Sequence, residues 1–350
     1  MPEGARVTTG GGLSVGPVAG PLLRDALARL LYGGASPSPE AVSRFIESAP
    51  DLGIDLGLVA AVIDRGGPPG QRVRQACMPV VGAGRTLMVF VSGPGSPQRF
   101  GGEQDQAAER AAAVLAALRL ARAEHGEGVG LVQALAEPGE TWAIEGFRLA
   151  GLRQITELLY LSRSMRGSER RDVIAPDGAV RPEAGSWPEG VRVRALGEGE
   201  SDESALERAL ELSYRDTLDC PELAGLRTLP DIIASHRAVG EYDPSLWWLV
   251  ERDGGAEGCV LLNHCSQQRC VELVYVGLAP GLRGLSLGSR LMEAAIGVGA
   301  GLERELRCAV DCRNLPARRM YERLGFRVVG RRAAFIAPAD ELVSRHVPLS

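Results

Sequence analysis

The chain of 350 residues contains no lysine: all 39 of its basic residues are arginine. A lysine Schiff base and a Walker A phosphate loop both need that amine, so the sequence excludes both. The chain also lacks any run of about 18 uncharged apolar residues, which a membrane-spanning helix requires. Residues 1–20 have neither the basic start nor the long apolar stretch of a secretory signal. We therefore expect a cytoplasmic protein that is not inserted in a membrane.

The sequence also lacks an excess of basic residues and the cysteine and histidine spacing of a common metal site. The 44 acidic residues outnumber the 39 basic ones, and the net charge of −5 disfavours a general nucleic-acid binder. The seven cysteines include no CxxC pair, and the spacing of His264, Cys265 and Cys270 fits no common zinc site. We predict no nucleic-acid partner, no metal, and free thiols buried in a reducing compartment.

Length and composition favour two globular domains. Hydrophobic residues make up 45% of the chain and charged residues 24%, which is close to the globular average. Residues 1–20 are glycine-rich and predicted to be loose. Residues 164–190 are polar and rich in proline and glycine, which is typical of a linker. The predicted domains are therefore residues 21–163 and 191–347.

The two halves share one order of elements, which indicates an internal duplication. Each half has helices, a hairpin, an apolar strand, a long helix, a strand, a short helix and a last strand. Gly146-Phe147 matches Gly325-Phe326 at an offset of about 180 residues. The predicted fold class is α/β, with a central mixed β-sheet flanked by helices in each half. Helices are predicted over 22–32, 39–49, 103–125, 140–146, 204–214, 229–239, 286–299 and 316–324, and strands over 58–64, 73–81, 86–92, 129–136, 155–162, 191–196, 246–252, 258–263, 270–278, 305–311 and 333–336.

A first motif lies where the strand over 270–278 leads into the helix over 286–299. It is the loop Arg283-Gly284-Leu285-Ser286-Leu287-Gly288. A tight loop at a helix N-terminus points backbone N–H groups into one concavity, and the helix dipole adds positive charge. A pyrophosphate fits such a site, with Gly288 keeping side-chain bulk away and Arg283 adding a charged contact. The alternative is an ordinary strand–loop–helix connection with chance glycines.

A second motif spans 310-VDCRNLPARRMYERLGF-326. It places Asn314, Ala317 and Tyr321 ahead of Gly325-Phe326. Ala317 and Tyr321 are four residues apart, so they share one face of the predicted helix.

In this order the two motifs resemble those of the GNAT superfamily of acetyl-CoA-dependent N-acetyltransferases, except that Ser286 stands at the usual middle glycine. The likeness is strong over about 191–340 and weak over 21–163. It implies acetyl-CoA as co-substrate, with the Leu278 N–H on the thioester carbonyl and Tyr321 protonating the leaving thiolate. The cofactor-binding set that the resemblance implies is Val276, Gly277, Leu278, Arg283, Gly284, Leu285, Ser286, Leu287, Gly288, Asn314 and Ala317.

Glu272 is the candidate general base. Alternate residues of an extended strand share a face, which puts Glu272 on the face of Leu278. The arrangement resembles the histone-type branch of the family, whose glutamate acts through water. An alkyl ammonium, with a pKa of about 10.4, must lose a proton before it attacks. The alternative is an exposed glutamate at a strand edge.

The acceptor side is less defined. Asp216, Asp219 and Glu222 lie close together in the region that the resemblance assigns to the acceptor, and such a cluster attracts a cationic amine. A solvated polar loop is the alternative. We expect a primary amine of a small molecule or a peptide as acceptor, and a monomer or homodimer.

The first half lacks both motifs. Gly101-Gly102 comes early, and Glu103 and Asp105 place negative charge at the helix start, which repels a pyrophosphate. No asparagine or tyrosine precedes Gly146-Phe147. We interpret residues 21–163 as a degenerate GNAT-like domain. The family includes tandem proteins, among them enzymes that acetylate a thiol-sugar amine.

The resemblance thus implies an N-acetyltransferase that moves the acetyl group directly, with its chemistry in residues 191–347. A non-catalytic acyl-CoA-binding sensor or scaffold is one alternative, because Ser286 departs from the loop pattern. An acyltransferase that uses a larger acyl donor is the other.

Overall fold

The computed structural model describes residues 7–8, 12–32, 38–68, 70–175, 177–182, 186–197 and 199–349. The chain divides into two compact units. The first unit comprises Met1–Ile155 and Ala333–Ser350, and the second unit comprises Thr156–Arg332. No helix in the described ranges is both long and apolar enough to cross a membrane.

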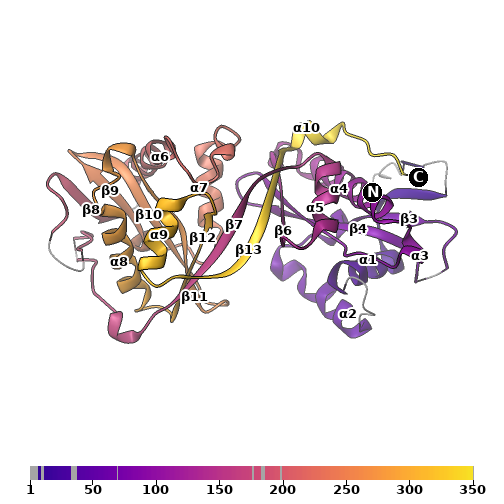
Figure 1. Cartoon of the computed structure of the whole chain (residues 1–350), viewed down its shortest axis with the longest axis horizontal. Helices are drawn as coiled ribbons and strands as arrows, with labels where there is room; N and C mark the ends of the chain where they lie inside the picture. The colour runs from indigo at the N-terminus through magenta and orange to yellow at the C-terminus, as the bar shows by residue number, and fades with distance from the viewer. Residues whose placement is uncertain are drawn as a thin grey trace. The chain divides into compact units, whose positions relative to one another are not determined.

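The first unit is a sheet covered by helices on both faces (Figure 1). Its strands are ordered β1-β2-β3-β4-β5-β6-β13, and only β5 and β6 run parallel. Their bounds are β1 Val7–Thr8, β2 Leu13–Pro17, β3 Ala60–Asp64, β4 Val73–Gly82, β5 Thr86–Val91, β6 Leu131–Ala136 and β13 Arg327–Pro338. Helices α4 (Glu103–His125), α5 (Thr141–Ala150) and α10 (Ala339–Val343) bury one face, while α1 (Gly20–Tyr32) and α2 (Pro39–Ser48) bury the other. A short helix α3 (Pro97–Phe100) precedes α4.

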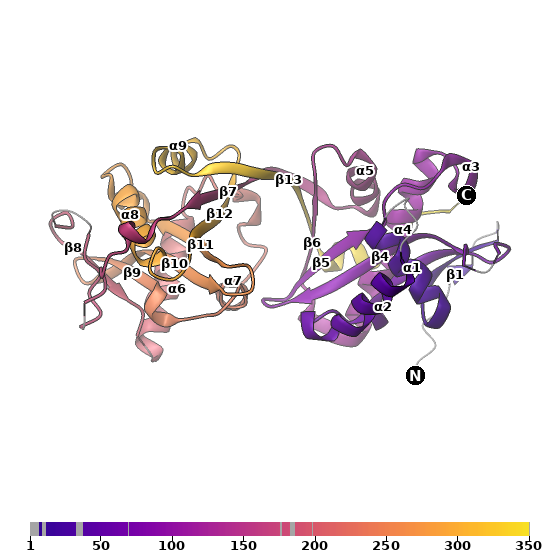
Figure 2. The ribbon, with the colours of Figure 1, turned by 90° about the horizontal axis from the view of Figure 1, so that it is seen from below.

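The second unit has the same layering, which is clearest in Figure 2. Its strands are ordered β7-β12-β11-β10-β9-β8, and only β11 and β12 run parallel. Their bounds are β7 Arg153–Ser164, β8 Val191–Ala195, β9 Trp247–Arg252, β10 Gly255–Cys265, β11 Cys270–Leu278 and β12 Glu305–Asp311. Helices α8 (Leu287–Gly299) and α9 (Leu315–Arg323) pack on one face, and α6 (Glu200–Tyr214) and α7 (Leu229–Arg237) on the other.

The unit boundaries differ from the predicted domains because the last strand of each half joins the other unit's sheet. Residues 158–164 of β7 pair with β12, and residues 333–338 of β13 pair with β6. Strand pairing depends on complementary backbone edges and buried faces, and it does not require the partners to be neighbours in sequence. The sequence pattern finds both strands, but it does not reveal their partners.

Two segments predicted to lie outside the domains, a loose N-terminus over 1–20 and a linker over 164–190, take part in the fold. Within 1–20, Leu13–Pro17 forms β2 against β3, because Leu13 and Val15 alternate into the core of the first unit; residues 1–6 and 9–11 lie outside the described residues. Within 164–190, Val173 and Val180 are buried in the core of the second unit. The described part of the predicted linker therefore packs against that unit.

The duplication has a different register from the predicted one. Gly325 ends α9 with φ +84°, and the following N–H of Phe326 bonds the Tyr321 carbonyl. Gly151 ends α5 in the same way, with φ +102°, and the following N–H of Leu152 bonds the carbonyl of Phe147. Gly325-Phe326 therefore matches Gly151-Leu152, not Gly146-Phe147, and the first-unit counterpart of Tyr321 is a phenylalanine.

The strand exchange gives β13 a structural role in the first unit. Phe335 is fully buried and its ring lies 5.6 Å from that of Phe147. We expect Phe335→Ala to destabilise the first unit by about 3–5 kcal/mol, through lost burial and a cavity. Hydrogen exchange of α4 and β6 measures the effect. Val329→Ala, on the same strand but 66% exposed, is the control, and equal exchange in both variants contradicts the assignment.

Candidate active site

The site begins where two parallel strands separate. Strands β11 and β12 pair at Val271↔Leu306 and Glu272↔Arg307, at the start of both strands. Beyond these pairs a cleft of about 460 Å³ is lined by residues 273–278 of β11 and by Ala309 and Val310 of β12. The cleft therefore lies between the diverging strands.

A β-bulge in β11 accompanies the separation. Leu261 of β10 pairs with Tyr275, whereas the next residue, Leu262, pairs with Leu273, so Val274 is an extra residue on β11. A bulge bends its strand and increases its local twist. We attribute the divergence of β11 from β12 to this bend.

Beyond the bulge, two backbone N–H groups turn toward the cleft. The N–H of Ala279 donates to the Glu257 carbonyl on the β10 side, at 2.7 Å. Because consecutive residues of an antiparallel strand alternate in direction, the N–H groups of Leu278 and Val276 point away from β10. They are placed to donate hydrogen bonds to a carbonyl in the cleft.

The bulge also puts Glu272 and Leu278 on different faces of the sheet. Leu273 and Leu278 both pack into the core beneath α8 and α9, so Glu272, the neighbour of Leu273, faces the opposite side of the sheet. The expectation that Glu272 and Leu278 share a face is wrong, because it assumed unbroken alternation. Glu272 does not line the cleft. Burial raises the pKa of its carboxyl, and the Arg307 guanidinium opposes that rise.

The loop before α8 forms with Ser286 in the left-handed region. Ser286 has φ +58° and ψ +10°, and Gly284 has φ +78°. Helix α8 then begins at Leu287. A Cβ added to Gly288 would lie 3.4 Å from the Met320 sulfur, an ordinary contact, so the fold alone does not require this glycine. The left-handed turn and the bare backbone fit an anion at the helix N-terminus.

Arg283 supports the cleft wall instead of extending freely into it. Its guanidinium donates to the carbonyls of Leu278 (2.9 Å), Asp216 (3.0 Å), Ser213 (3.0 Å) and Arg215 (2.7 Å). The side chain therefore joins the end of β11 to the end of α6. This differs from the predicted pyrophosphate contact, because the nearby carbonyls already engage its donors.

Helix α9 supplies the opposite wall. Ala317 and Tyr321 both line the cleft, as their four-residue spacing predicts. Asn314 is the N-cap of α9, and its side-chain oxygen accepts the Ala317 N–H at 3.3 Å. Tyr321 is 5% exposed, and burial raises the pKa of its phenol well above the usual value. The phenol therefore stays protonated at neutral pH and can act as a proton donor.

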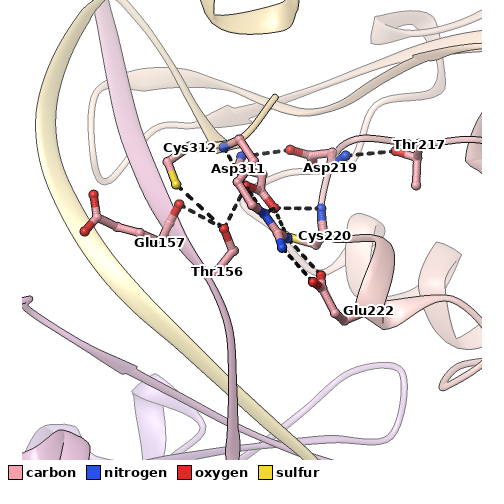
Figure 3. A network of polar contacts seen from close by, with 9 residues as sticks. Thr156, Glu157, Thr217, Asp219, Cys220, Glu222, Asp311 and Cys312 are labelled. Carbon is pink, nitrogen blue, oxygen red and sulfur yellow. Dashed lines mark hydrogen bonds and ion pairs between the residues drawn. The ribbon is translucent and has the colours of Figure 1, made fainter. Parts of the chain in front are cut away.

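The three acidic residues predicted to bind the acceptor have different surroundings, and Figure 3 shows two of them, Asp219 and Glu222. Glu222 forms a two-pronged ion pair with Arg313, at 2.7 and 2.9 Å. Asp219 lines the cleft and accepts the Asp311 N–H at 2.8 Å. Asp216 also lines the cleft. Glu222 is thus neutralised by Arg313, and the open cluster that the spacing predicted does not form.

Sequence reasoning missed the centre of this network, Asp311. Its carboxylate is fully buried and accepts hydrogen bonds from Thr156 Oγ1 (2.7 Å), the Cys220 N–H (3.2 Å) and Arg313 Nη2 (2.6 Å) (Figure 3). Burial opposes its ionisation, but these bonds together lower the pKa of Asp311. Nothing in the sequence signals the network, because its members lie on β7, β12 and the loop after α6.

The cleft brings together most of the predicted site residues. Those that line it are Asp216, Asp219, Val276, Gly277, Leu278, Arg283, Gly284, Ser286, Leu287, Gly288, Asn314, Ala317 and Tyr321. Leu285, Glu222 and Glu272 do not, and Leu285 is exposed. Arg323, at the end of α9, lines the cleft without having been predicted. Among the described residues, no group of three His, Cys, Asp or Glu side chains could hold a metal.

Ser286 generates a stability prediction. A side chain in the left-handed region costs about 1 kcal/mol, so Ser286→Gly should raise the free energy of unfolding by up to that amount. Ser286→Ala keeps the Cβ and should change it by less than about 0.5 kcal/mol. Thermal unfolding measures both variants. A glycine variant less stable than the alanine variant contradicts the assigned conformation.

Arg283 generates a second prediction. Arg283→Met removes charged donors from four carbonyls and should cost about 2–4 kcal/mol. It should also speed hydrogen exchange over residues 213–217, because their link to β11 is lost. The exposed Arg192 on β8 provides the control, Arg192→Met. Unchanged exchange over 213–217 would show that Arg283 does not hold this segment.

Known proteins resemble both the sequence and the fold. The family described as "Acetyltransferase (GNAT) family" matches residues 212–326. A mycothiol acetyltransferase of Beutenbergia cavernae is 32% identical over 197 residues, which cover 54% of this chain and 61% of that protein. A mycothiol acetyltransferase of Thermomonospora curvata is 32% identical over 219 residues, covering 59% of this chain and 67% of that protein. The match thus spans less than two thirds of the Beutenbergia protein.

A solved structure extends the comparison over 95% of the chain. The GCN5-related N-acetyltransferase from Sphaerobacter thermophilus superposes with a TM-score of 0.55 at 22% identity, covering 95% of this chain and 97% of that one. At this identity the likeness concerns the fold. The matched family segment, the relatives of similar sequence and this common fold together show that the chain belongs to the GNAT acetyltransferase family.

Proposed function

We propose that the second unit transfers an acetyl group from acetyl-CoA directly to a primary amine. The observation that carries the proposal is the cleft between β11 and β12. It combines backbone N–H groups on one wall, a left-handed loop at a helix N-terminus, and a buried tyrosine on the other wall. An acyl thioester needs these three features: a carbonyl donor, an anion site and an acid.

The residues of the cleft fit acetyl-CoA. The bare Gly288 position and the left-handed turn at Gly284 and Ser286 leave room for a pyrophosphate at the start of α8. The N–H groups of Val276 and Leu278 would receive the thioester carbonyl, and the Ala317 face of α9 the pantetheine arm. When bound, acetyl-CoA supplies an activated acetyl group. The Leu278 N–H polarises the carbonyl toward attack by the amine.

Tyr321 is the proposed general acid. Expulsion of a thiolate needs a proton at the sulfur, and the Tyr321 phenol stays protonated because its pKa is raised by burial. It lies on the cleft wall formed by α9, next to the face of Ala317. We therefore assign the protonation of the leaving thiolate to Tyr321.

We also propose that the first unit is a degenerate copy without transferase chemistry. Phe147, at the position matching Tyr321, has no hydroxyl to donate. Glu103 and Asp105 lie in the first turn of α4, where their charge opposes a pyrophosphate. The first unit keeps the fold but lacks the acid and the anion site.

The acceptor in this proposal is a small-molecule amine. The relatives named mycothiol acetyltransferase support it, and they make unacetylated mycothiol the first amine to test. Ser286 adopts the left-handed φ of +58° at the position where the family has glycine, so the serine keeps the turn at a cost of about 1 kcal/mol.

The test compares Tyr321→Phe with the exposed Tyr242→Phe as control. Tyr321→Phe should lower kcat by about 100-fold or more, because a general acid contributes that much, while acetyl-CoA binds as before. Acetylated product is measured by mass spectrometry, with unacetylated mycothiol and glucosamine as acceptors. An unchanged kcat removes Tyr321 from the mechanism. Absence of transfer by the unaltered protein to both amines overturns the proposed acceptor class.

A further inference from the structure

We propose that Tyr160 on β7 forms the floor of the acceptor site, on the face of the sheet opposite α8 and α9. The inference rests on the proposed function and names a residue that binds its acceptor. Strand β7 lies beside β12 in the sheet of the second unit (Figure 1). Because β7 ends the first half of the sequence, neither motif of the second half points to Tyr160.

The strand register places Tyr160 near the candidate base Glu272. Glu272 of β11 pairs with Arg307 of β12, and Arg307 pairs with Ser162 of β7. Two residues further along β12, Ala309 pairs with Tyr160. Paired residues and alternate residues of a strand share a face of the sheet. Glu272, Ala309 and Tyr160 therefore lie on one face, and Tyr160 lies one row closer to the end of β12.

This part of the sheet has no helix over it. Leu159 and Leu161 are buried in the core beneath α8 and α9, so Tyr160 between them points to the other face. The core beneath α6 and α7 includes residues of β9 and β10 but, among the described residues, none of β12 or β7. Ala309 is exposed and Tyr160 is half-buried. The surface over β12 and β7 is thus open to a ligand.

The open surface continues into the cleft. Ala309 lines the cleft together with Asp219 of the loop between α6 and α7. That loop borders the surface at the end of β12, where the Asp311 carboxylate accepts the Cys220 N–H at 3.2 Å and Asp219 Oδ1 accepts the Asp311 N–H at 2.8 Å (Figure 3). An amine lying on Tyr160 and Ala309 therefore reaches the cleft from the side opposite α8 and α9.

The Tyr160 side chain has the chemistry of a binding floor. A tyrosine combines a large rigid ring with one hydroxyl group. Burial raises the pKa of the Tyr160 phenol, and the negative charge of Glu272 adds to the rise against the Arg332 guanidinium. The hydroxyl stays protonated at neutral pH and can donate a hydrogen bond to an oxygen of the acceptor. The charge of Glu272 on the same face attracts the ammonium group.

Steady-state kinetics of Tyr160→Ala in the full chain tests the inference, with glucosamine and unacetylated mycothiol as acceptors. The KM for the acceptor should rise about tenfold or more, because a ligand contact made equally before and during the reaction is lost. The KM for acetyl-CoA should stay within about twofold, because its proposed contacts lie on β11, α9 and the loop before α8. Acetyl-CoA affinity, measured by calorimetry, should also be unchanged.

Three further variants separate binding from structure. Tyr160→Phe keeps the ring and should raise the KM for the acceptor less than Tyr160→Ala does. Ser164→Ala is the matched control, because Ser164 is exposed on the same face of β7 and pairs with Glu305, two rows further from the cleft. Tyr160→Leu keeps an apolar side chain on the strand, and it replaces Tyr160→Ala if that variant loses acetyl-CoA binding.

Two results overturn the inference while acetyl transfer itself persists. An unchanged KM for the acceptor in Tyr160→Ala removes Tyr160 from the acceptor site. An equal rise in the KM values for acceptor and acetyl-CoA, in both Tyr160→Ala and Tyr160→Leu, assigns Tyr160 a structural role. If the unaltered protein transfers no acetyl group to either amine, the proposed function fails, and the acceptor floor fails with it.

Discussion

The second unit depends on the separation of β11 from β12. Backbone N–H groups inside a sheet are normally paired, and leaving them unpaired is costly unless water or a ligand satisfies them. The extra residue Val274 bends β11 away from its parallel partner, so the N–H groups of Val276 and Leu278 face a cleft. Helices α8 and α9 pack on the same face of the sheet and bring the loop before α8 and the Tyr321 phenol to this gap. The cleft thus lies where β11 and β12 stop pairing with each other.

Arginines hold the surroundings of the cleft together. In a chain without lysine every basic anchor is a guanidinium, which presents five donors in a planar arrangement. Arg283 joins β11 to the end of α6 through four carbonyls. Arg313 bridges Asp311 and Glu222, which ties the loop after α6 to β12. Arg283, for which the sequence suggests a ligand contact, and Arg313 both position the loop that carries Asp216 and Asp219.

The sequence predicts the local elements and the residues that share a helix face, but it does not predict which strands pair over long range. The bounds of α4, β11 and β12 agree with the prediction, and the α9 face of Ala317 and Tyr321 lines the cleft as its spacing indicates. The exchange of β7 and β13 was missed, because hydrophobic periodicity does not name a partner strand. The bulge at Val274 was missed because the run ELVYVGL has no glycine or polar break at that residue. That extra residue breaks the alternation on which the predicted common face of Glu272 and Leu278 depended.

The central claim is that one unit of this chain forms an acetyl-CoA site and the other does not. Calorimetric titration of the whole protein with acetyl-CoA tests it most directly, with CoA and a desulfo analogue as controls. The account predicts one site per chain. Two sites would contradict the interpretation of the first unit, and no binding would contradict the assignment of the loop at Gly284 and Ser286 to a pyrophosphate.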